Sequence, residues 1–150
     1  MGKINGVSML IFLMPMLILG GCGGESVELV KAQKLHAYNT ERYDDMEATG
    51  KLIDGVRVIE IKSFQFFFEP GLIIVNEGEK VKLIVTAEDV PHGFEIEGFQ
   101  IPGYDINTKI RPGMPLELEF VADEKGVWEF ICTIFCGFGH SDMTGTFVIR

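Results

Sequence analysis

The sequence has few cysteines, three in 150 residues, at positions 22, 132 and 136. Cys22 closes an apolar N-terminal stretch, which leaves one pair near the C-terminus, so the chain is not a disulfide-stapled scaffold. Basic residues are also scarce, because 13 Lys and Arg stand against 22 Asp and Glu, a net charge of −9. Such a protein repels the phosphates of nucleic acids and attracts basic partners. We therefore expect no nucleic-acid partner.

Long apolar runs are missing after residue 22, since no later segment is apolar over the 18 or so residues that a membrane-spanning helix needs. Near the N-terminus, a polar start containing Lys3 precedes the apolar run Met9–Leu19. This run is too short to span a bilayer as a helix, and Pro15 interrupts it. The pattern is typical of a signal peptide, and we interpret residues 1–21 as one.

The residues Leu19-Gly20-Gly21-Cys22 resemble the bacterial lipobox. That resemblance implies that Cys22 is lipidated and that the chain is cleaved before it. An ordinary signal peptide or a short retained anchor is the alternative. We expect an exported protein, lipid-anchored to a bacterial membrane and facing the periplasm or the cell exterior.

Residues 22–54 are mostly polar, and their few apolar side chains follow a helical spacing only loosely. We expect this segment to be a tether or a helix that packs on the domain. His36 has no second ligand type at a metal-binding spacing nearby, so we interpret it as a polar surface residue.

The remaining chain, residues 55–150, has the pattern of short strands. Apolar and polar residues alternate in Val56–Ile61, Lys80–Val85 and Leu116–Phe120. Turn signals separate these and shorter β-rich runs: Pro70-Gly71, Asn76-Glu77-Gly78, Pro102-Gly103, Pro112-Gly113 and Glu124-Lys125-Gly126. No internal repeat or low-complexity tract is present. The pattern predicts one all-β domain, a small Greek-key β-sandwich.

One loop concentrates metal-binding side chains between two strand-like runs. Two thiols, an imidazole and a thioether lie close together there, namely Cys132, Cys136, His140 and Met143. Soft sulfur ligands suit Cu(I), zinc or iron–sulfur centres, and imidazole also suits copper. One Cys with His and a weak Met makes a mononuclear blue-copper set. Two thiolates on one tight loop could instead bridge two metals.

Two further features support a compact site. Gly137 and Gly139 lack Cβ atoms, which lets the backbone fold closely around a metal cluster. His92 follows the strand-like run 80–85 and could supply a second imidazole, because a sandwich brings loops together at one end. Three alternatives stay open: a zinc site using both His and both Cys, a Cys132–Cys136 disulfide, and a Met143 that only packs the core.

These residues and their spacing resemble the CuA motif of haem–copper oxidase subunit II, and nitrous-oxide reductase carries a similar domain. The resemblance extends from Val56 to Arg150 and includes Gln65-Phe66-Phe67-Phe68-Glu69-Pro70. It implies a cupredoxin-like fold and two copper ions per chain. By this resemblance Cys132 and Cys136 bridge the coppers, and His92 and His140 each terminate one. The Met143 thioether and the Ile134 carbonyl are then weak ligands.

The same resemblance implies the function. It indicates single-electron transfer between a c-type cytochrome, or another redox protein, and a terminal oxidase or reductase. A haem-bearing oxidase subunit is a further partner that it implies. The alternative is a protein that stores copper or delivers it for oxidase assembly. We expect no catalysis from the chain alone, because no nucleophile–base pair is evident.

Two details of this sequence differ from the subunit II pattern. Ile134 stands where many oxidases have a Glu that helps to bind magnesium, and Phe66, Phe67 and Phe68 replace a Trp-containing aromatic stretch. Apolar cover that excludes water from the metal site could come from Phe135, Phe138 and Trp128, which lie on the ligand loop or just before it. Plain core or rim packing is the alternative, above all for Trp128.

Overall fold

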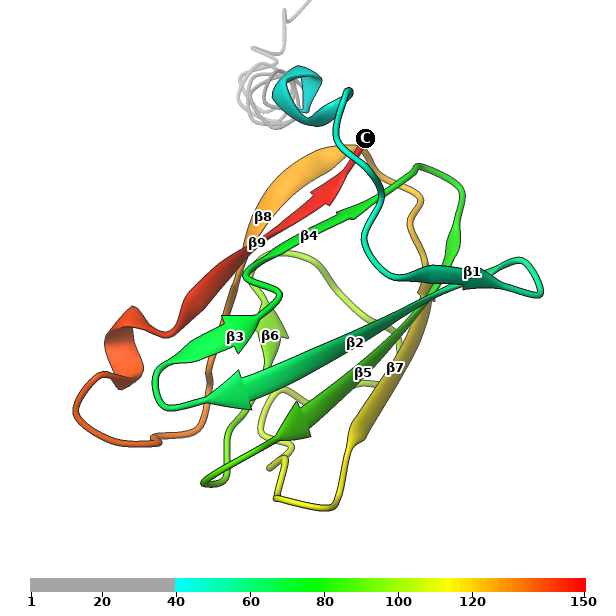
Figure 1. Cartoon of the computed structure of the whole chain (residues 1–150). Helices are drawn as coiled ribbons and strands as arrows, with labels where there is room; N and C mark the ends of the chain where they lie inside the picture. Colours follow the sequence, from blue (N-terminus) through cyan, green and yellow to red (C-terminus); the bar gives the residue numbers. More distant parts are fainter. Residues whose placement is uncertain (1–39) are drawn as a thin grey trace, which may run out of the picture.

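The computed structural model describes residues 40–150, which form strands and two short 3-10 helices. The elements are η1 (Glu41–Tyr43), β1 (Lys51–Ile53), β2 (Val56–Phe64), β3 (Phe67–Glu69), β4 (Leu72–Val75), β5 (Lys80–Ala87), β6 (Glu95–Ile96), β7 (Leu116–Val121), β8 (Gly126–Ile131), η2 (His140–Asp142) and β9 (Thr144–Ile149). The predicted all-β fold is confirmed (Figure 1).

The strands form two sheets that face each other across the core. One has the order β1-β2-β5-β7, with β3 also paired to β2, and the other has the order β4-β9-β8-β6. Consecutive strands from β3 to β8 alternate between the sheets, so the chain crosses the sandwich repeatedly. As a result β2 pairs in parallel with β5 and β4 with β9, while the other pairs are antiparallel.

Strand β5 shows why the alternating sequence gives this sandwich. Its apolar side chains Val81, Leu83 and Val85 are at most 1% exposed, because successive residues of a strand point to opposite faces. Leu83 lies opposite Leu118 of β7 in the register of the sheet. On the outer face, Lys82 forms an ion pair with Glu117 at 2.7 Å. Burying one face of each such strand is the main driving force for folding.

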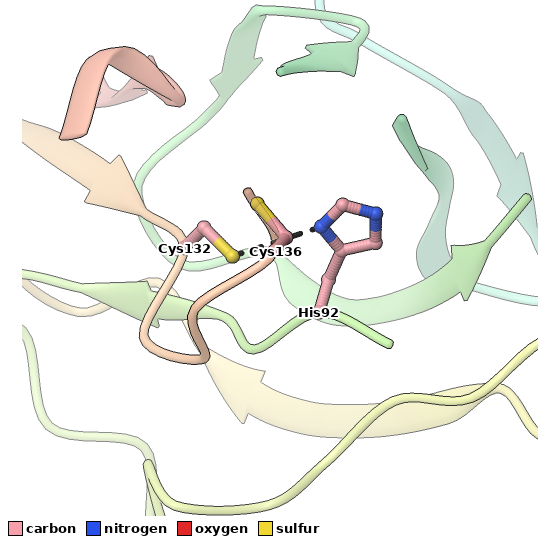
Figure 2. Close-up of side chains that lie close together, drawn as sticks. All are labelled: His92, Cys132 and Cys136. Carbon is pink, nitrogen blue, oxygen red and sulfur yellow. Dashed lines mark hydrogen bonds between the residues drawn. The ribbon is translucent and has the colours of Figure 1, made fainter. Parts of the chain in front are cut away.

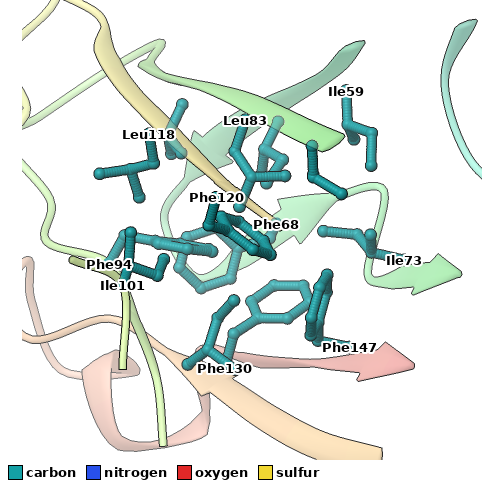
Figure 3. Packing of buried hydrophobic residues seen from close by; sticks show 14 of the residues in the cluster. Ile59, Phe68, Ile73, Leu83, Phe94, Ile101, Leu118, Phe120, Phe130 and Phe147 are labelled. Atoms are coloured by element: carbon teal, nitrogen blue, oxygen red, sulfur yellow. The ribbon is translucent and has the colours of Figure 1, made fainter. Parts of the chain in front are cut away.

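Aromatic side chains fill the core between the sheets (Figure 3). The ring of Phe68 meets the rings of Phe94 and Phe130 edge-on, with centroids 5.9 and 5.2 Å apart, an arrangement that aromatic rings favour. The same buried cluster includes three of the expected ligands: Cys132, Cys136 and Met143. These sulfur atoms therefore lie at one end of a close-packed core.

The folded unit begins before the expected domain start at residue 55. Strand β1 pairs with β2, and the side chain of Tyr43 packs with Ile74 and Val148. The Arg150 guanidinium donates hydrogen bonds to the backbone carbonyls of Tyr43 and Asp44, which ties this segment to the C-terminus (Figure 1). Residues 40–53 are thus part of the domain.

The proposed signal peptide, the lipidation site Cys22 and His36 lie outside the described residues. Between residues 40 and 150, no helix combines the length and apolar character needed to cross a membrane.

An ion pair joins the start of β2 to the turn that precedes β5. Arg57 donates two hydrogen bonds to the Glu79 carboxylate, at 2.7 and 3.2 Å, and both side chains are mostly buried. Asn76 also donates to Glu79 through its backbone and side-chain amides. The hydrogen bond from Arg57, helped by Asn76, lowers the pKa of Glu79 from 4.5 to about 2.

We therefore expect a pH-dependent loss of stability in Glu79→Gln. Because folding lowers the Glu79 pKa, its contribution is present above about pH 4.5 and is lost as the pH falls towards 2. At pH 7 the variant should be less stable by about 2 kcal/mol, allowing for partial exposure. Denaturant unfolding across this pH range measures it. Glu77→Gln is the control, because Glu77 is half exposed and its ion pair with Lys125 is long, at 3.8 Å. Such an exposed pair contributes little to stability. A Glu79→Gln deficit that stays constant down to pH 2 would contradict the account.

Candidate metal centre

The loop from Cys132 to Met143 connects two adjacent antiparallel strands, β8 and β9. Ile131 at the end of β8 pairs with Thr144 at the start of β9, and the Cys132 amide donates to the Met143 carbonyl at 3.2 Å. The ends of the loop are thus held together by the sheet. Within the loop, η2 turns the chain so that His140 faces back towards Cys136.

His92 reaches the same place from the opposite sheet, after β5. Its backbone exchanges two hydrogen bonds with Ile110, at 3.0 and 2.9 Å, and its side chain is completely buried. The ring atom Nε2 lies 2.8 Å from Asp89 Oδ1, and Nδ1 lies 3.7 Å from Cys132 Sγ. Because a carboxylate only accepts, we assign the imidazole proton to Nε2, which leaves the lone pair of Nδ1 directed at Cys132.

Asp89 holds this imidazole in place. Its carboxylate also accepts hydrogen bonds from the backbone amides of Val90 at 2.6 Å and Gln65 at 2.7 Å. Although burial raises the pKa of Asp89, these hydrogen bonds, the one from His92 first among them, lower it overall. A carboxylate on the far nitrogen of a histidine is the usual way in which proteins orient a histidine that ligates a metal.

The two thiols lie between the two imidazoles. Cys136 Sγ is 3.6 Å from His140 Nδ1 and 3.8 Å from Met143 Sδ, whereas Cys132 lies beside His92 and donates to the Ile134 carbonyl at 3.2 Å. The ligand atoms of His92, Cys132 and Cys136 all lie within 4.8 Å of one another (Figure 2). The structure thus brings together all six residues that the sequence indicated.

The donor atoms of the site suit a soft metal, whose binding must overcome the protonation of the thiols. Both cysteines are free and buried, and burial, with Cys132 nearby, raises the pKa of Cys136 to about 11. A metal that binds here must displace thiol protons. Two sulfurs, two imidazole nitrogens and a thioether are donors that suit copper, so the residues fit such a centre. Because both cysteines are free in this structure, it does not show the Cys132–Cys136 disulfide that was one of the alternatives.

Gly93 allows the two ligand segments to approach closely. Its amide nitrogen lies 3.5 Å from Cys132 Sγ. A Cβ atom on Gly93 would lie 2.1 Å from Thr133 Oγ1 and 2.9 Å from the Ile134 nitrogen. Only glycine fits at this position. No role for Gly93 or Asp89 was evident from the sequence, although both lie within three residues of His92 and this proximity was the available signal.

Comparison with known proteins agrees with this geometry. The family described as cytochrome c oxidase subunit II, periplasmic domain, matches residues 26–149. The chain belongs to this family. A subunit 2 of Thermus thermophilus cytochrome c oxidase is 32% identical over 92 residues, which cover 61% of this chain and 64% of that protein. The nitrous-oxide reductase of Ralstonia nicotianae is 35% identical over 80 residues, 51% of this chain and 12% of that enzyme.

Solved structures support the fold of this chain. A heme-copper terminal oxidase dimer studied by cryo-electron microscopy has a matching chain with a TM-score of 0.56 and 24% identity, covering 83% of this chain and 95% of that one. Auracyanin B matches with a TM-score of 0.51 and 15% identity, over 69% of this chain and 95% of its own. The cupredoxin-like sandwich is therefore confirmed. The chain spans 64% and 52% of the length of the two Thermus relatives.

The structure separates the three aromatic residues that could cover the site: two lie at the surface, and Trp128 packs on the core, which was the alternative for it. Phe135 is 73% exposed and Phe138 is fully exposed, because the loop turns its ligand side chains inward and these two rings outward. Trp128 packs instead against Phe99 and Phe147, with ring centroids 5.2 and 6.1 Å away. The two phenylalanines form an apolar surface next to the ligands, and the ring of Phe135 lies 5.7 Å from the His140 ring.

A hollow of about 500 Å³ opens beside the ligand loop of the domain. Three of the six candidate ligands and two glutamates line it. The lining residues are Glu97, Glu129, Ile131, Cys132, His140, Ser141, Met143 and Thr144. A larger hollow of about 810 Å³, between Glu95 and Ile106, is lined by none of these ligands. We therefore associate the smaller one with the chemistry of the site.

Proposed function

We propose that this chain holds a binuclear copper centre and passes single electrons between a c-type cytochrome, or another redox protein, and a terminal oxidase or reductase. One observation carries the proposal: two buried thiols lie together, each beside the Nδ1 atom of a different histidine. Cys132 and Cys136 would bridge the two ions, and His92 and His140 would each bind one. Met143 Sδ and the Ile134 carbonyl would be weak ligands.

When bound, the copper pair supplies one-electron oxidation and reduction. The residues of the chain fix its surroundings. Asp89 locks the His92 ring, and the burial of Met143 and both cysteines in the core limits how far the ligands move between redox states. The same packing leaves these three side chains almost fully buried, although a hollow opens beside the loop. A rigid, mostly buried ligand set lowers the cost of reorganisation when an electron arrives or leaves.

Surface features support a redox partner. The net charge of −9 favours association with a basic cytochrome. Phe135 and Phe138 expose apolar rings beside His140, and such a surface is typical of a protein contact. A haem-bearing oxidase subunit is the further partner that we propose. Residues 1–21 would export the chain, and a lipid on Cys22 would hold it on the outer side of a bacterial membrane.

Electron transfer with a basic c-type cytochrome tests this function. We expect the bimolecular rate, measured by stopped-flow absorbance of the haem, to fall steeply as ionic strength rises. Phe135→Ala/Phe138→Ala should slow the reaction about tenfold or more, because aromatic residues dominate protein contacts. Met114→Ala is the control, since Met114 is also exposed (62%) but lies outside the ligand loop. An electron-transfer rate that changes neither with ionic strength nor in the Phe135→Ala/Phe138→Ala variant would contradict the partner proposal.

The alternative, copper storage or delivery, is favoured by one observation, the hollow that leads from the surface to Cys132, His140 and Met143. A delivery protein gives up Cu(I) readily, whereas an electron carrier retains it through many redox cycles. The release rate of copper to a Cu(I) chelator separates the two functions.

Met143→Leu should keep both coppers but raise the reduction potential. Leu has a similar volume, so we expect a stability cost below about 1.5 kcal/mol. Loss of the thioether should destabilise the oxidised centre relative to the reduced one, because a weak sulfur ligand tunes the potential of a copper site. Protein-film voltammetry measures the shift. An unchanged potential and absorption spectrum would remove Met143 from the ligand set and leave it a core residue.

A further inference from the structure

The turn from β2 to β3 contains no sulfur or imidazole, yet it contacts both segments that carry the candidate ligands. The backbone amide of Gln65 donates to Asp89 Oδ2 at 2.7 Å, and Asp89 in turn holds His92 through its other oxygen. The side-chain amide of Gln65 donates to the carbonyl of Cys136. One residue thus links the His92 segment to the cysteine loop.

The next residue, Phe66, packs against the same loop. A Cβ atom on Gly139 would lie 2.4 Å from Phe66 Cδ2, and one on Gly137 would lie 2.9 Å from the ring. Gly137 also has a φ angle of +137°, a region that other residues rarely adopt. The two glycines of the loop therefore make room for the Phe66 ring. Figure 1 shows the β2–β3 turn beside the loop that precedes β9.

These contacts connect parts of the chain that the topology keeps apart. His92 follows β5 of the first sheet, whereas Cys136 and His140 lie between β8 and β9 of the second. The distance between the two segments decides whether both imidazoles reach the sulfurs. Any contact that fixes this distance in advance reduces the ordering that metal binding must otherwise impose.

We propose that Gln65 and Phe66 are positioning residues that clamp the two ligand segments together before the metal binds. The inference rests on the proposed copper site, which gives the clamp its purpose. Gln65 fixes the segments by hydrogen bonds at both ends, and Phe66 supports the turn of the loop between Cys136 and His140. Neither residue binds the metal. Their effect on the metal is indirect, through the positions of His92 and Cys136.

The metal-free protein provides the first test. The amides of His140, Asp142 and Met143 donate to carbonyls within the loop, so their hydrogen exchange reports its order. We expect exchange at these amides to accelerate about tenfold or more in Gln65→Met and in Phe66→Ala. Phe67→Ala is the matched control, because Phe67 is 51% exposed and stacks on Phe64 at 4.9 Å. The amides of β5 serve as the reference for global stability.

The second test uses copper. In competition with a Cu(I) chelator, Gln65→Met and Phe66→Ala should bind copper about 10 to 100 times more weakly than the unaltered chain, and Phe67→Ala equally well. Phe66→Tyr, which keeps the ring, should restore most of the affinity.

Exchange and affinity that match the Phe67→Ala control in both variants would overturn the clamp. If Phe66→Ala does not fold, Gln65→Met alone decides. An unaltered chain that fails to bind two coppers would refute the proposed function, whereas the exchange experiment would still judge the clamp.

Discussion

Cys136→Ser is expected to abolish the two-copper centre and leave at most one copper per chain. Cys136 Sγ lies 3.6 Å from His140 Nδ1 and 3.8 Å from Met143 Sδ, so its loss removes the atom around which half of the ligand set gathers. A serine hydroxyl is a hard donor that binds Cu(I) poorly and is not deprotonated near neutral pH. Cys132→Ser should have the same effect. Metal analysis together with the visible spectrum measures the result.

The fold should survive this replacement. Burying a hydroxyl in place of the thiol costs about 1–3 kcal/mol, which a domain of this size usually tolerates. Ser141→Ala is the control, because Ser141 lies on the same loop and makes only a 3.5 Å contact with Asp142. Two coppers and an unchanged spectrum in Cys136→Ser would show that the thiol does not bridge.

Gly93→Ala is expected to weaken copper binding strongly and to destabilise the fold. The new Cβ would lie 2.1 Å from Thr133 Oγ1 and 2.9 Å from the Ile134 nitrogen. The second of these atoms is backbone, so the His92 segment and the cysteine loop must move apart. We expect overpacking to cost about 1–3 kcal/mol and copper affinity to fall by about 100-fold, since both His92 and Cys132 shift.

Gly71→Ala is the matched control for Gly93→Ala. A Cβ on Gly71 would have only an ordinary contact, at 3.6 Å from the Phe68 carbonyl. Chelator competition and denaturant unfolding of both variants make the comparison. Equal copper affinity in the two alanine variants would contradict the close approach that we assign to Gly93.

The sequence predicted the layered β fold because alternation reports which face of a strand is buried. Lys80–Val85 lies within β5, and its apolar side chains point inward as expected. The parallel pairing of β2 with β5 was not predictable, since it depends on contacts between segments far apart in the chain. The same holds for β1 and Tyr43, whose burial requires Ile74 and Val148. Local pattern reports the strand, and tertiary contacts decide its neighbour.

The site, like the fold, was predictable where it depends on residues close in sequence and not where it depends on contacts between distant segments. Cys132, Cys136 and His140 are close in sequence, so their proximity in space was predictable from the short loop. The contacts of Gln65 and Asp89 were not, because hydrogen bonds between distant segments leave no local pattern. Its apolar character suggested that Phe135 covers the metal site, but this ring is 73% exposed. The expectation that apolar side chains are buried often fails at functional surfaces, where exposed apolar residues contact a partner.

The most direct measurement combines metal content with the electron-spin spectrum of the copper-loaded chain. The account predicts a purple protein with two coppers per chain and a signal from one unpaired electron shared over two copper nuclei. A blue protein with one copper per chain, or a colourless protein that binds zinc in its place, would contradict the binuclear centre.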